Sequence, residues 1–238
     1  MLNVHLQKYN GEFIGDFVQS AYEGLVNLGY SDIKYFENFS EIPYERNCLI
    51  VGSVESSIRY FENINIPIPE VLNIPNSLQP YLKRNINVME MGEFRKNYKL
   101  PTFIKPYDRV KYFPSGVASK KSTIDFLLSD IPNDFRVLTS DVVNMVSEYR
   151  CFINKGKLVG MKHYLGDFKI FPNVDLIEEC ISKCNIDNIS YTMDFAITDK
   201  NETILIELND GWSVGSYGLD PEIYVKFIID RWRQILQN

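Results

Sequence analysis

Histidine and cysteine are scarce in this chain, and positive charge is not in excess. Its 238 residues include two histidines and four cysteines, and the formal net charge is −6 with a pI near 5.1. This acidic balance argues against nonspecific binding to a nucleic-acid backbone, which needs a basic surface. His5 and His163 lack the serine or cysteine context of a nucleophilic triad. A nucleic-acid partner and a hydrolase with a histidine base are therefore both disfavoured.

The cysteines do not form a pattern that is typical of a metal site. Cys180 and Cys184 are four residues apart on a predicted helix, but no histidine or second cysteine pair accompanies them. Zinc is usually held by a fuller set of such ligands. We therefore expect small buried thiols in a reducing compartment.

Targeting and membrane segments are also missing. The start of the sequence has no positively charged region followed by an apolar core, so a signal peptide is not predicted. No apolar run approaches the roughly 20 residues of a membrane-spanning helix. With 45% hydrophobic and 24% charged residues, the chain has the composition of a soluble globular protein. We expect it in the cytoplasm, without a membrane partner.

The first part of the chain alternates short apolar strands with helical patterns. The predicted strands are residues 2–6, 33–36 and 48–52, and the predicted helices are residues 13–28 and 54–61. Strands that alternate with helices favour a parallel α/β unit. No Gly-rich dinucleotide fingerprint follows the first strand, so we expect a scaffold or substrate platform here rather than a cofactor site.

A segment rich in proline and asparagine, residues 64–80, marks a junction with a second part of different character. Strand pairs with helices beside them then predict an α+β unit. The fold class is accordingly an α/β N-terminal subdomain, residues 1–80, followed by an α+β domain, residues 81–238. In the second part the predicted strands are residues 87–95, 102–105, 135–144, 147–153 and 157–164, and the predicted helices are residues 122–128, 174–183 and 221–236.

Polar side chains interrupt two apolar strands that a short turn joins, in residues 191–209. Asp194 lies in the first strand, and Glu207 and Asn209 lie in the second. Glu207 and Asn209 are two residues apart, so they project to the same face of a strand. Three oxygen ligands without cysteine or histidine suit a hard cation such as Mg²⁺, which commonly also binds nucleotide phosphates. The alternative is a hairpin with solvent-facing acids.

Several cations upstream are candidates for phosphate contacts. Lys105 ends an apolar strand and precedes a proline, and Lys111 lies in the polar loop that follows. Each could equally be an exposed lysine. Glu148 and Arg150 are two apart on a strand, so Arg150 pairs either with Glu148 or with an anionic ligand. Lys162 follows on the return strand of the same hairpin.

These residues together resemble an ATP-grasp domain. The order Asp194, then Glu207-x-Asn209 across a hairpin, matches the metal-binding strands of that family in order and spacing. The sequence FIKP at residues 103–106 resembles the family's phosphate-binding lysine strand, and EYR at residues 148–150 resembles the acidic-x-Arg strand of amidoligase-type members. The segment ELNDGWSVGSYGLD, residues 207–220, replaces the usual substrate loop. This version is similar to a clade of bacterial and phage ATP-grasp proteins that is marked by one arginine and two lysines.

The resemblance implies ATP and Mg²⁺ as cofactors, with Mn²⁺ as a possible substitute, and a set of residue roles. It implies that the chain is a ligase that activates a carboxylate as an acyl phosphate for attack by an amine or a thiol. The metal would be held by Asp194, Glu207 and Asn209. The clade's arginine and lysines would be Arg150, Lys105 and Lys111, and the residues expected to contact the nucleotide are these three with Asp141, Val143, Glu148 and Lys162.

Other points stay open at the level of the sequence. Many members have a further lysine upstream of the FIKP strand, for which Lys83 or Arg84 could substitute. Trp212 and Tyr217 either contact substrate or pack on the C-terminal helix. A regulatory ATP-binding module and a phosphotransferase on the same fold are the alternative functions. The carboxylate, the amine acceptor and the oligomeric state are not predicted.

Overall fold

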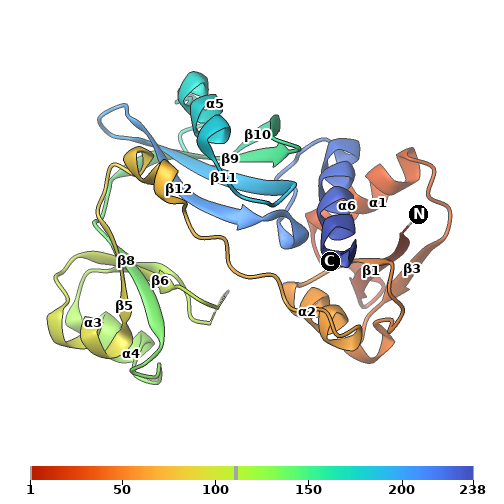
Figure 1. Ribbon diagram of the computed structural model, residues 1–238, viewed down its shortest axis with the longest axis horizontal. Helices are drawn as coiled ribbons and strands as arrows, with labels where there is room; N and C mark the ends of the chain where they lie inside the picture. Colours follow the sequence, from red (N-terminus) through yellow and green to blue (C-terminus); the bar gives the residue numbers. More distant parts are fainter. Residues whose placement is uncertain (1, 110–111, 238) are drawn as a thin grey trace.

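Three sheets follow one another along the molecule in the computed structural model, which describes residues 2–109 and 112–237 (Figure 1). We call them the first, central and outer sheets. The first sheet lies near the N-terminus, the outer sheet lies at the opposite end, and the central sheet lies between them. This arrangement leaves the central sheet with a neighbour on each side.

The first sheet is largely parallel, as the sequence predicts. Strand β1 (Asn3–Tyr9) lies between β3 (Ile33–Phe36) and β4 (Cys48–Val51) and runs parallel to both, while the short β2 (Glu12–Phe13) folds back on β1. Helices α1 (Asp16–Asn27) and α2 (Val54–Asn63) follow β2 and β4, and η1 (Phe39–Glu41) is a short 3₁₀ turn. All four residues of β4 are buried, which explains its unbroken apolar sequence.

The outer sheet is antiparallel, with the order β5-β8-β6-β7. Its strands are β5 (Ile86–Glu90), β6 (Thr102–Pro106), β7 (Gly116–Ala118) and β8 (Arg136–Ser140), and helices α3 (Met91–Asn97) and α4 (Lys121–Leu127) pack on it. The predicted strand over residues 87–95 is wrong in its second half, where α3 begins. Met91 and Phe94, three residues apart, both face the core of this sheet, which is helical rather than strand spacing.

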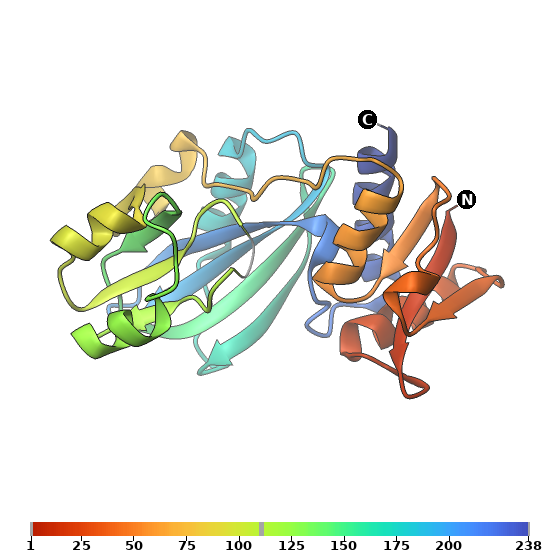
Figure 2. The same cartoon turned by 90° about the horizontal axis from the view of Figure 1, so that it is seen from below.

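The central sheet has the order β10-β9-β11-β12 and is antiparallel throughout. Its strands are β9 (Met145–Asn154), β10 (Lys157–Gly166), β11 (Ser190–Thr198) and β12 (Thr203–Asp210). Helix α5 (Val174–Lys183) covers one face, where Ile177 and Cys180 are buried with Cys151 and Met193 (Figure 1). In Figure 2 the strands extend from beneath the outer sheet towards the first sheet. The face away from α5 is the one that carries the candidate site.

The C-terminal helix α6 (Pro221–Gln237) connects the central and first sheets. It packs closely on α1, where a Cβ atom added to Gly24 would lie 2.1 Å from the carbonyl oxygen of Pro221. Phe227 of α6 meets Phe152 of β9 with ring centroids 5.5 Å apart. Since α6 shares one core with the first sheet, the division at residue 80 stays a prediction.

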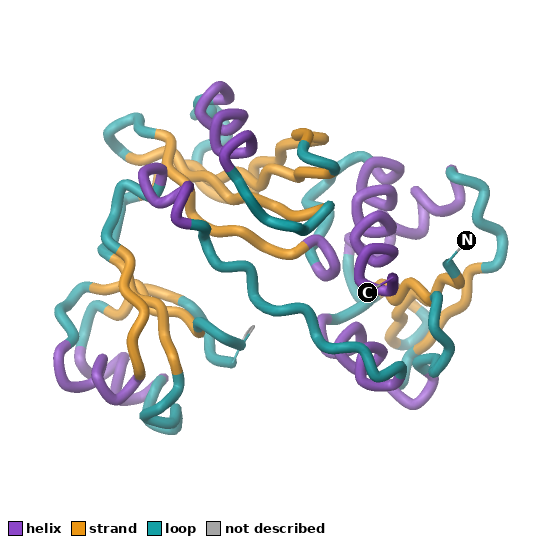
Figure 3. Tube along the Cα trace, in the orientation of Figure 1, coloured by secondary structure: helices purple, strands orange, loops and turns teal. Residues whose placement is uncertain are grey.

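The proline-rich junction is a long loop that ends in the 3₁₀ turn η2 (Asn76–Tyr81). It passes from α2 to the outer sheet along the side of the central sheet (Figure 3, teal). Among the helices of residues 2–109 and 112–237, none has the length and apolar character needed to cross a membrane.

Candidate active site

A row of charged side chains crosses one face of the central sheet. Lys162 on β10 is paired with Arg150 on β9, Arg150 with Asp194 on β11, and Asp194 with Glu207 on β12. Directly opposed residues of antiparallel strands share a face. Asn209 lies two residues beyond Glu207 and therefore on the same face. The structure thus brings five sequence-predicted residues together.

Arg150 and Asp194 form a buried ion pair at the centre of this row. The guanidinium donates from Nε to Oδ1 of Asp194 over 2.8 Å and from Nη2 to Oδ2 over 2.6 Å. The Asp194 side chain is only 2% exposed, and burial raises the pKa of Asp194 to about 6 against the opposing effect of Arg150. Burial alone would lower the pKa of Arg150, but the bonds from its guanidinium to Asp194 raise it. At neutral pH the pair is therefore ionised on both sides.

Glu207 is paired with a lysine that comes from the outer sheet. Lys105 on β6, 102 residues away in the sequence, places Nζ 2.9 Å from Oε2 of Glu207. The side-chain nitrogen of Asn209 donates to the other oxygen, Oε1, over 3.2 Å. Burial by itself would raise the pKa of Glu207, but Lys105 and Asn209 outweigh it, so this pKa is lowered. One carboxylate thus connects the two sheets across the cleft.

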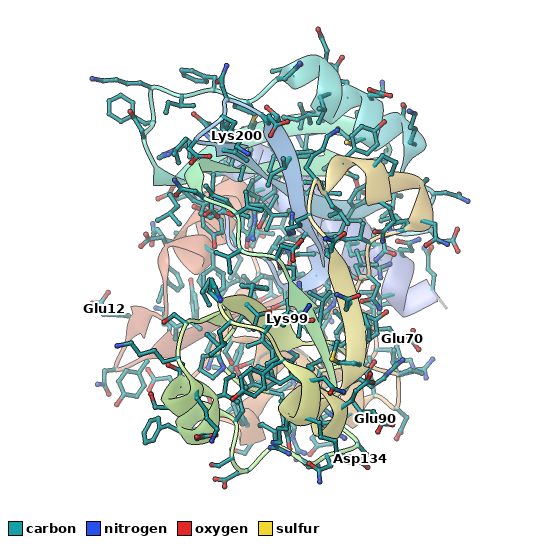
Figure 4. The ribbon with its side chains drawn as sticks, turned by 90° about the vertical axis from the view of Figure 1, so that its left-hand side faces the viewer. Glu12, Glu70, Glu90, Lys99, Asp134 and Lys200 are labelled. Atoms are coloured by element: carbon teal, nitrogen blue, oxygen red, sulfur yellow. The ribbon has the colours of Figure 1, made fainter. Side chains whose placement is uncertain are left out.

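A cavity of about 420 Å³ lies between the outer and central sheets. Its charged lining includes Lys105, Glu148 and Glu207, and its apolar lining includes Phe103, Leu138, Ile206 and Leu72. A small-molecule site typically combines such a volume with apolar walls and a few placed polar groups. Figure 4 looks at the molecule from the side of the outer sheet, beyond which the cavity lies.

The residues predicted to lie beside the adenine line this same cavity. Residues 141–144 connect β8 of the outer sheet to β9 of the central sheet, and Val143 contributes to the wall. The Asp141 carboxylate accepts hydrogen bonds from the backbone N–H of Asn85 over 3.1 Å and from its Nδ2 over 2.7 Å. Asp141 therefore fixes the conformation of this connection as well as lining the cavity.

Two tyrosines that the sequence did not single out as a pair surround Arg150. The guanidinium carbon lies 4.6 Å from the ring centre of Tyr217 and 5.9 Å from that of Tyr164. The Tyr164 hydroxyl donates to Oε2 of Glu148 over 2.8 Å. The open question of the Arg150 partner is thereby answered, since the described ion pair is with Asp194 and Glu148 is held by a tyrosine. No signal in the local sequence links Tyr164 to Glu148.

The remaining candidates are placed differently. The guanidinium of Arg84 lines the cavity but donates to the carbonyl oxygens of Leu205 and Ile206, so it fastens β12. Lys162 belongs to the charged row but does not line the cavity between the sheets. Lys111 lies outside the described residues, and its role stays a prediction.

The donor chemistry of Asp194, Glu207 and Asn209 fits a hard cation, because two carboxylates and an amide oxygen share one face beside the cavity. Across residues 2–109 and 112–237, no three His, Cys, Asp or Glu side chains converge as a metal site, in keeping with a set that includes an asparagine. Each carboxylate of the set is paired with a cation of the chain. The side chains therefore fit Mg²⁺ by type, and the ion would compete with Arg150 and Lys105 for their oxygens.

Solved structures with the same architecture define the class of fold. The chain is similar to N5-carboxyaminoimidazole synthetase from Staphylococcus aureus, with a TM-score of 0.59 at 10% identity over 97% of this chain and 77% of that one. It is also similar to D-alanine–D-alanine ligase from Bacillus anthracis complexed with ATP, with a TM-score of 0.55 at 14% identity over 99% and 97% of the two chains. A RimK domain ATP-grasp protein from Sphaerobacter thermophilus gives a TM-score of 0.54 at 11% identity over 95% and 99%. At these identities the likeness shows the fold, which is the ATP-grasp fold.

The family follows from the sequence itself. Residues 81–227 match the profile of an ATP-grasp domain, family 2 of the clade that is marked by one arginine and two lysines, and this match covers more than half of the chain. The chain therefore belongs to this clade of the ATP-grasp superfamily, which confirms the resemblance seen in its motifs. No curated protein matches it.

Proposed function

We propose that this protein is an ATP-dependent ligase that joins a carboxylate to an amine, or to a thiol, through an acyl phosphate. The observation that carries the proposal is the charged row that faces a cavity of nucleotide size, with Lys105 reaching it from the opposite sheet. Phosphoryl transfer needs positive charge around the γ-phosphoryl group and an aligned acceptor, and little else from the protein. The cleft offers positive charge from two sheets.

Lys105 and Arg150 are the cations that would stabilise the transferring phosphoryl group. Glu207 and Asp194 hold them in the cleft by ion pairs of 2.9 Å and 2.6 Å. Charges that are fixed before the reaction stabilise a transition state without the cost of reorganisation. Arg150 is further fixed by the ring of Tyr217. Both side chains are thus held at the surface of the cleft before substrate arrives.

Asp194, Glu207 and Asn209 would hold Mg²⁺, which when bound acts as a Lewis acid and offsets the charge of the phosphate oxygens. Phe103, Leu138 and the segment at residues 141–144 would enclose the adenine in the apolar part of the cavity. Four free cysteines and the use of ATP fit the cytoplasmic setting that the sequence predicts.

The chemistry balances without a nucleophilic side chain. An oxygen of the substrate carboxylate attacks the γ-phosphorus, and ADP leaves. The amine then attacks the carbonyl carbon of the acyl phosphate, phosphate leaves with the oxygen that came from the carboxylate, and the nitrogen loses a proton. The role of the chain is to align the groups, to hold charge at the cleft and to exclude water.

Hydroxylamine tests this proposal without knowledge of the natural acceptor, because it traps acyl phosphates as hydroxamates. Purified protein, Mg-ATP and hydroxylamine would be incubated with pools of amino acids, small acids and peptides, and ADP and hydroxamate would be measured. We expect at least one pool to give both products in equal amounts. Phosphorylated product without hydroxamate would instead identify a phosphotransferase.

A matched pair of variants makes the test specific to the site. Glu207→Gln removes a carboxylate of the charged row, and Glu202→Gln removes an exposed carboxylate from the turn of the same hairpin. We expect the first variant to lose hydroxamate formation and the second to retain it. Equal activities in the two variants would contradict the placement of the site.

A further inference from the structure

Two further cavities continue from the charged row towards the first sheet. One, of about 310 Å³, is lined by Arg150, Asn209 and Tyr217. The other, of about 300 Å³, reaches the start of α2. The two share Val54 and residues 212–215, so they form one passage, which we call the acceptor passage. It begins beside the residues proposed to activate the carboxylate, and therefore lies where a second substrate would wait.

The deeper half of the acceptor passage is apolar and aromatic. Its walls include Phe17, Ile50, Ile228 and both tryptophans of the chain, Trp212 and Trp232. The tryptophan rings are fixed from behind by Phe61 of α2, whose ring centre lies 5.5 Å from Trp212 and 5.1 Å from Trp232. Rigid aromatic walls of this kind suit a bulky apolar group.

The charge of the acceptor passage is negative once its ion pairs are counted. Arg150 is paired with Asp194, and Asp210 is paired with Arg231 at 2.6 Å. Glu55 at the start of α2 and Glu70 on the proline-rich loop also line the passage. Neither has an ion-pair partner among residues 2–109 and 112–237, and both are exposed. Figure 4 shows Glu70 at the outer side of the molecule, as expected for a residue at the entrance.

We propose that the acceptor passage takes a cationic amine on a bulky apolar or aromatic body and discriminates against anions. The apolar body would lie against Trp212 and Trp232, and Glu55 and Glu70 would attract the ammonium group. Its assignment as the acceptor site rests on the proposed ligase function, whereas the class of ligand rests only on the lining of the passage. An anionic acceptor would meet two unpaired carboxylates and no free cation among the residues that line the passage.

Fluorescence of the two tryptophans measures this binding directly, because both line the deeper cavity. The full chain, without ATP, would be titrated with phenethylamine, 2-phenylethanol and 3-phenylpropionate, which share a phenyl ring and differ in charge. Exposed charge pairs change affinity modestly, so we expect the amine to bind about two- to twentyfold more tightly than the alcohol. The carboxylate should bind most weakly, and high salt should reduce the advantage of the amine.

Variants assign the charge preference to residues. Glu55→Gln with Glu70→Gln should bring the affinity for the amine down to that for the alcohol. Glu62→Gln serves as the control, since Glu62 is an exposed acid of the same helix that pairs with Arg59 and does not line the passage. Far-UV circular dichroism would verify that each variant is folded.

Three results would overturn the proposal: no fluorescence change with any of the probes, binding of the carboxylate as tightly as the amine, or an unchanged preference in the double variant. These results are separate from those of the hydroxylamine assay. Ordered binding of the probes without hydroxamate would support the ligand class and contradict the ligase function. Hydroxamate without binding of the amine would support the ligase and contradict this assignment of the passage.

Discussion

Removing either member of the Arg150–Asp194 pair is expected to destabilise the protein strongly, and removing both is expected to cost little more. The pair has two short hydrogen bonds, of 2.8 Å and 2.6 Å, and a carboxylate that is 2% exposed. Loss of one partner leaves an uncompensated buried charge, which typically costs about 3–5 kcal/mol. In the double variant no such charge remains. We therefore expect a coupling energy of about 2–3 kcal/mol between the two sites.

The assay is a double-mutant cycle with Arg150→Met and Asp194→Asn. Urea unfolding without nucleotide and with a chelator would be followed by tryptophan fluorescence and circular dichroism, whose agreement justifies a two-state treatment. Arg59 and Glu62 supply the control cycle, since their pair is 3.5 Å long with side chains 48% and 53% exposed. An exposed pair of this kind should show a coupling of about 0.5 kcal/mol or less.

Additive effects at Arg150 and Asp194 would refute this reasoning. If the double variant lost the sum of the two single losses, the guanidinium and the carboxylate would not depend on each other for stability. A coupling no larger than that of the Arg59–Glu62 cycle would lead to the same conclusion. The argument that these charges hold each other in the cleft would then fail.

Three further variants test other parts of the account. Lys105→Ala should reduce ATP turnover about 100-fold or more, because it removes the cation that the outer sheet extends to Glu207, while the exposed Lys99 (Figure 4) should be replaceable by alanine without effect on ADP release. Gly24→Ala should lower the free energy of unfolding by about 1–3 kcal/mol, since its Cβ would meet backbone of α6 at 2.1 Å, whereas Gly116→Ala has open space and should change it by about 0.5 kcal/mol or less, as urea unfolding would show. Cys184 is the one partly exposed cysteine of the described chain, so Ellman's reagent should modify one thiol first, and Cys184→Ser should abolish that phase; early modification of a second thiol would contradict the buried positions.

The metal-binding side of the site could be predicted from the sequence because it depends on local geometry. Glu207 and Asn209 share a face through the period of a strand, and Asp194 lies on the adjacent strand of the same hairpin. A short connection forces these two strands to pair, so spacing in the sequence translates directly into position in space. The resemblance to ATP-grasp domains then supplied the nature of the ligand.

The ion pairs of the site could not be predicted, because they depend on contacts between distant strands. Glu148 is two residues from Arg150 and was an open candidate for its partner, yet the carboxylate that binds Arg150 is 44 residues away on the neighbouring strand. Lys105 and Glu207 meet across two different sheets. The helix at Met91–Asn97 was missed for a related reason, since its apolar residues read as a continuation of β5. Local pattern does not determine which element covers an apolar face.

Transfer of oxygen from carboxylate to phosphate is the most direct test of the central claim. A pool of carboxylates exchanged in oxygen-18 water would be incubated with the protein, Mg-ATP and amines, and the released phosphate would be analysed by mass spectrometry. The account predicts that phosphate released during turnover carries one oxygen-18 atom from the carboxylate, and that Glu207→Gln abolishes its release. Turnover that releases only unlabelled phosphate would contradict an acyl phosphate and, with it, the proposed ligase.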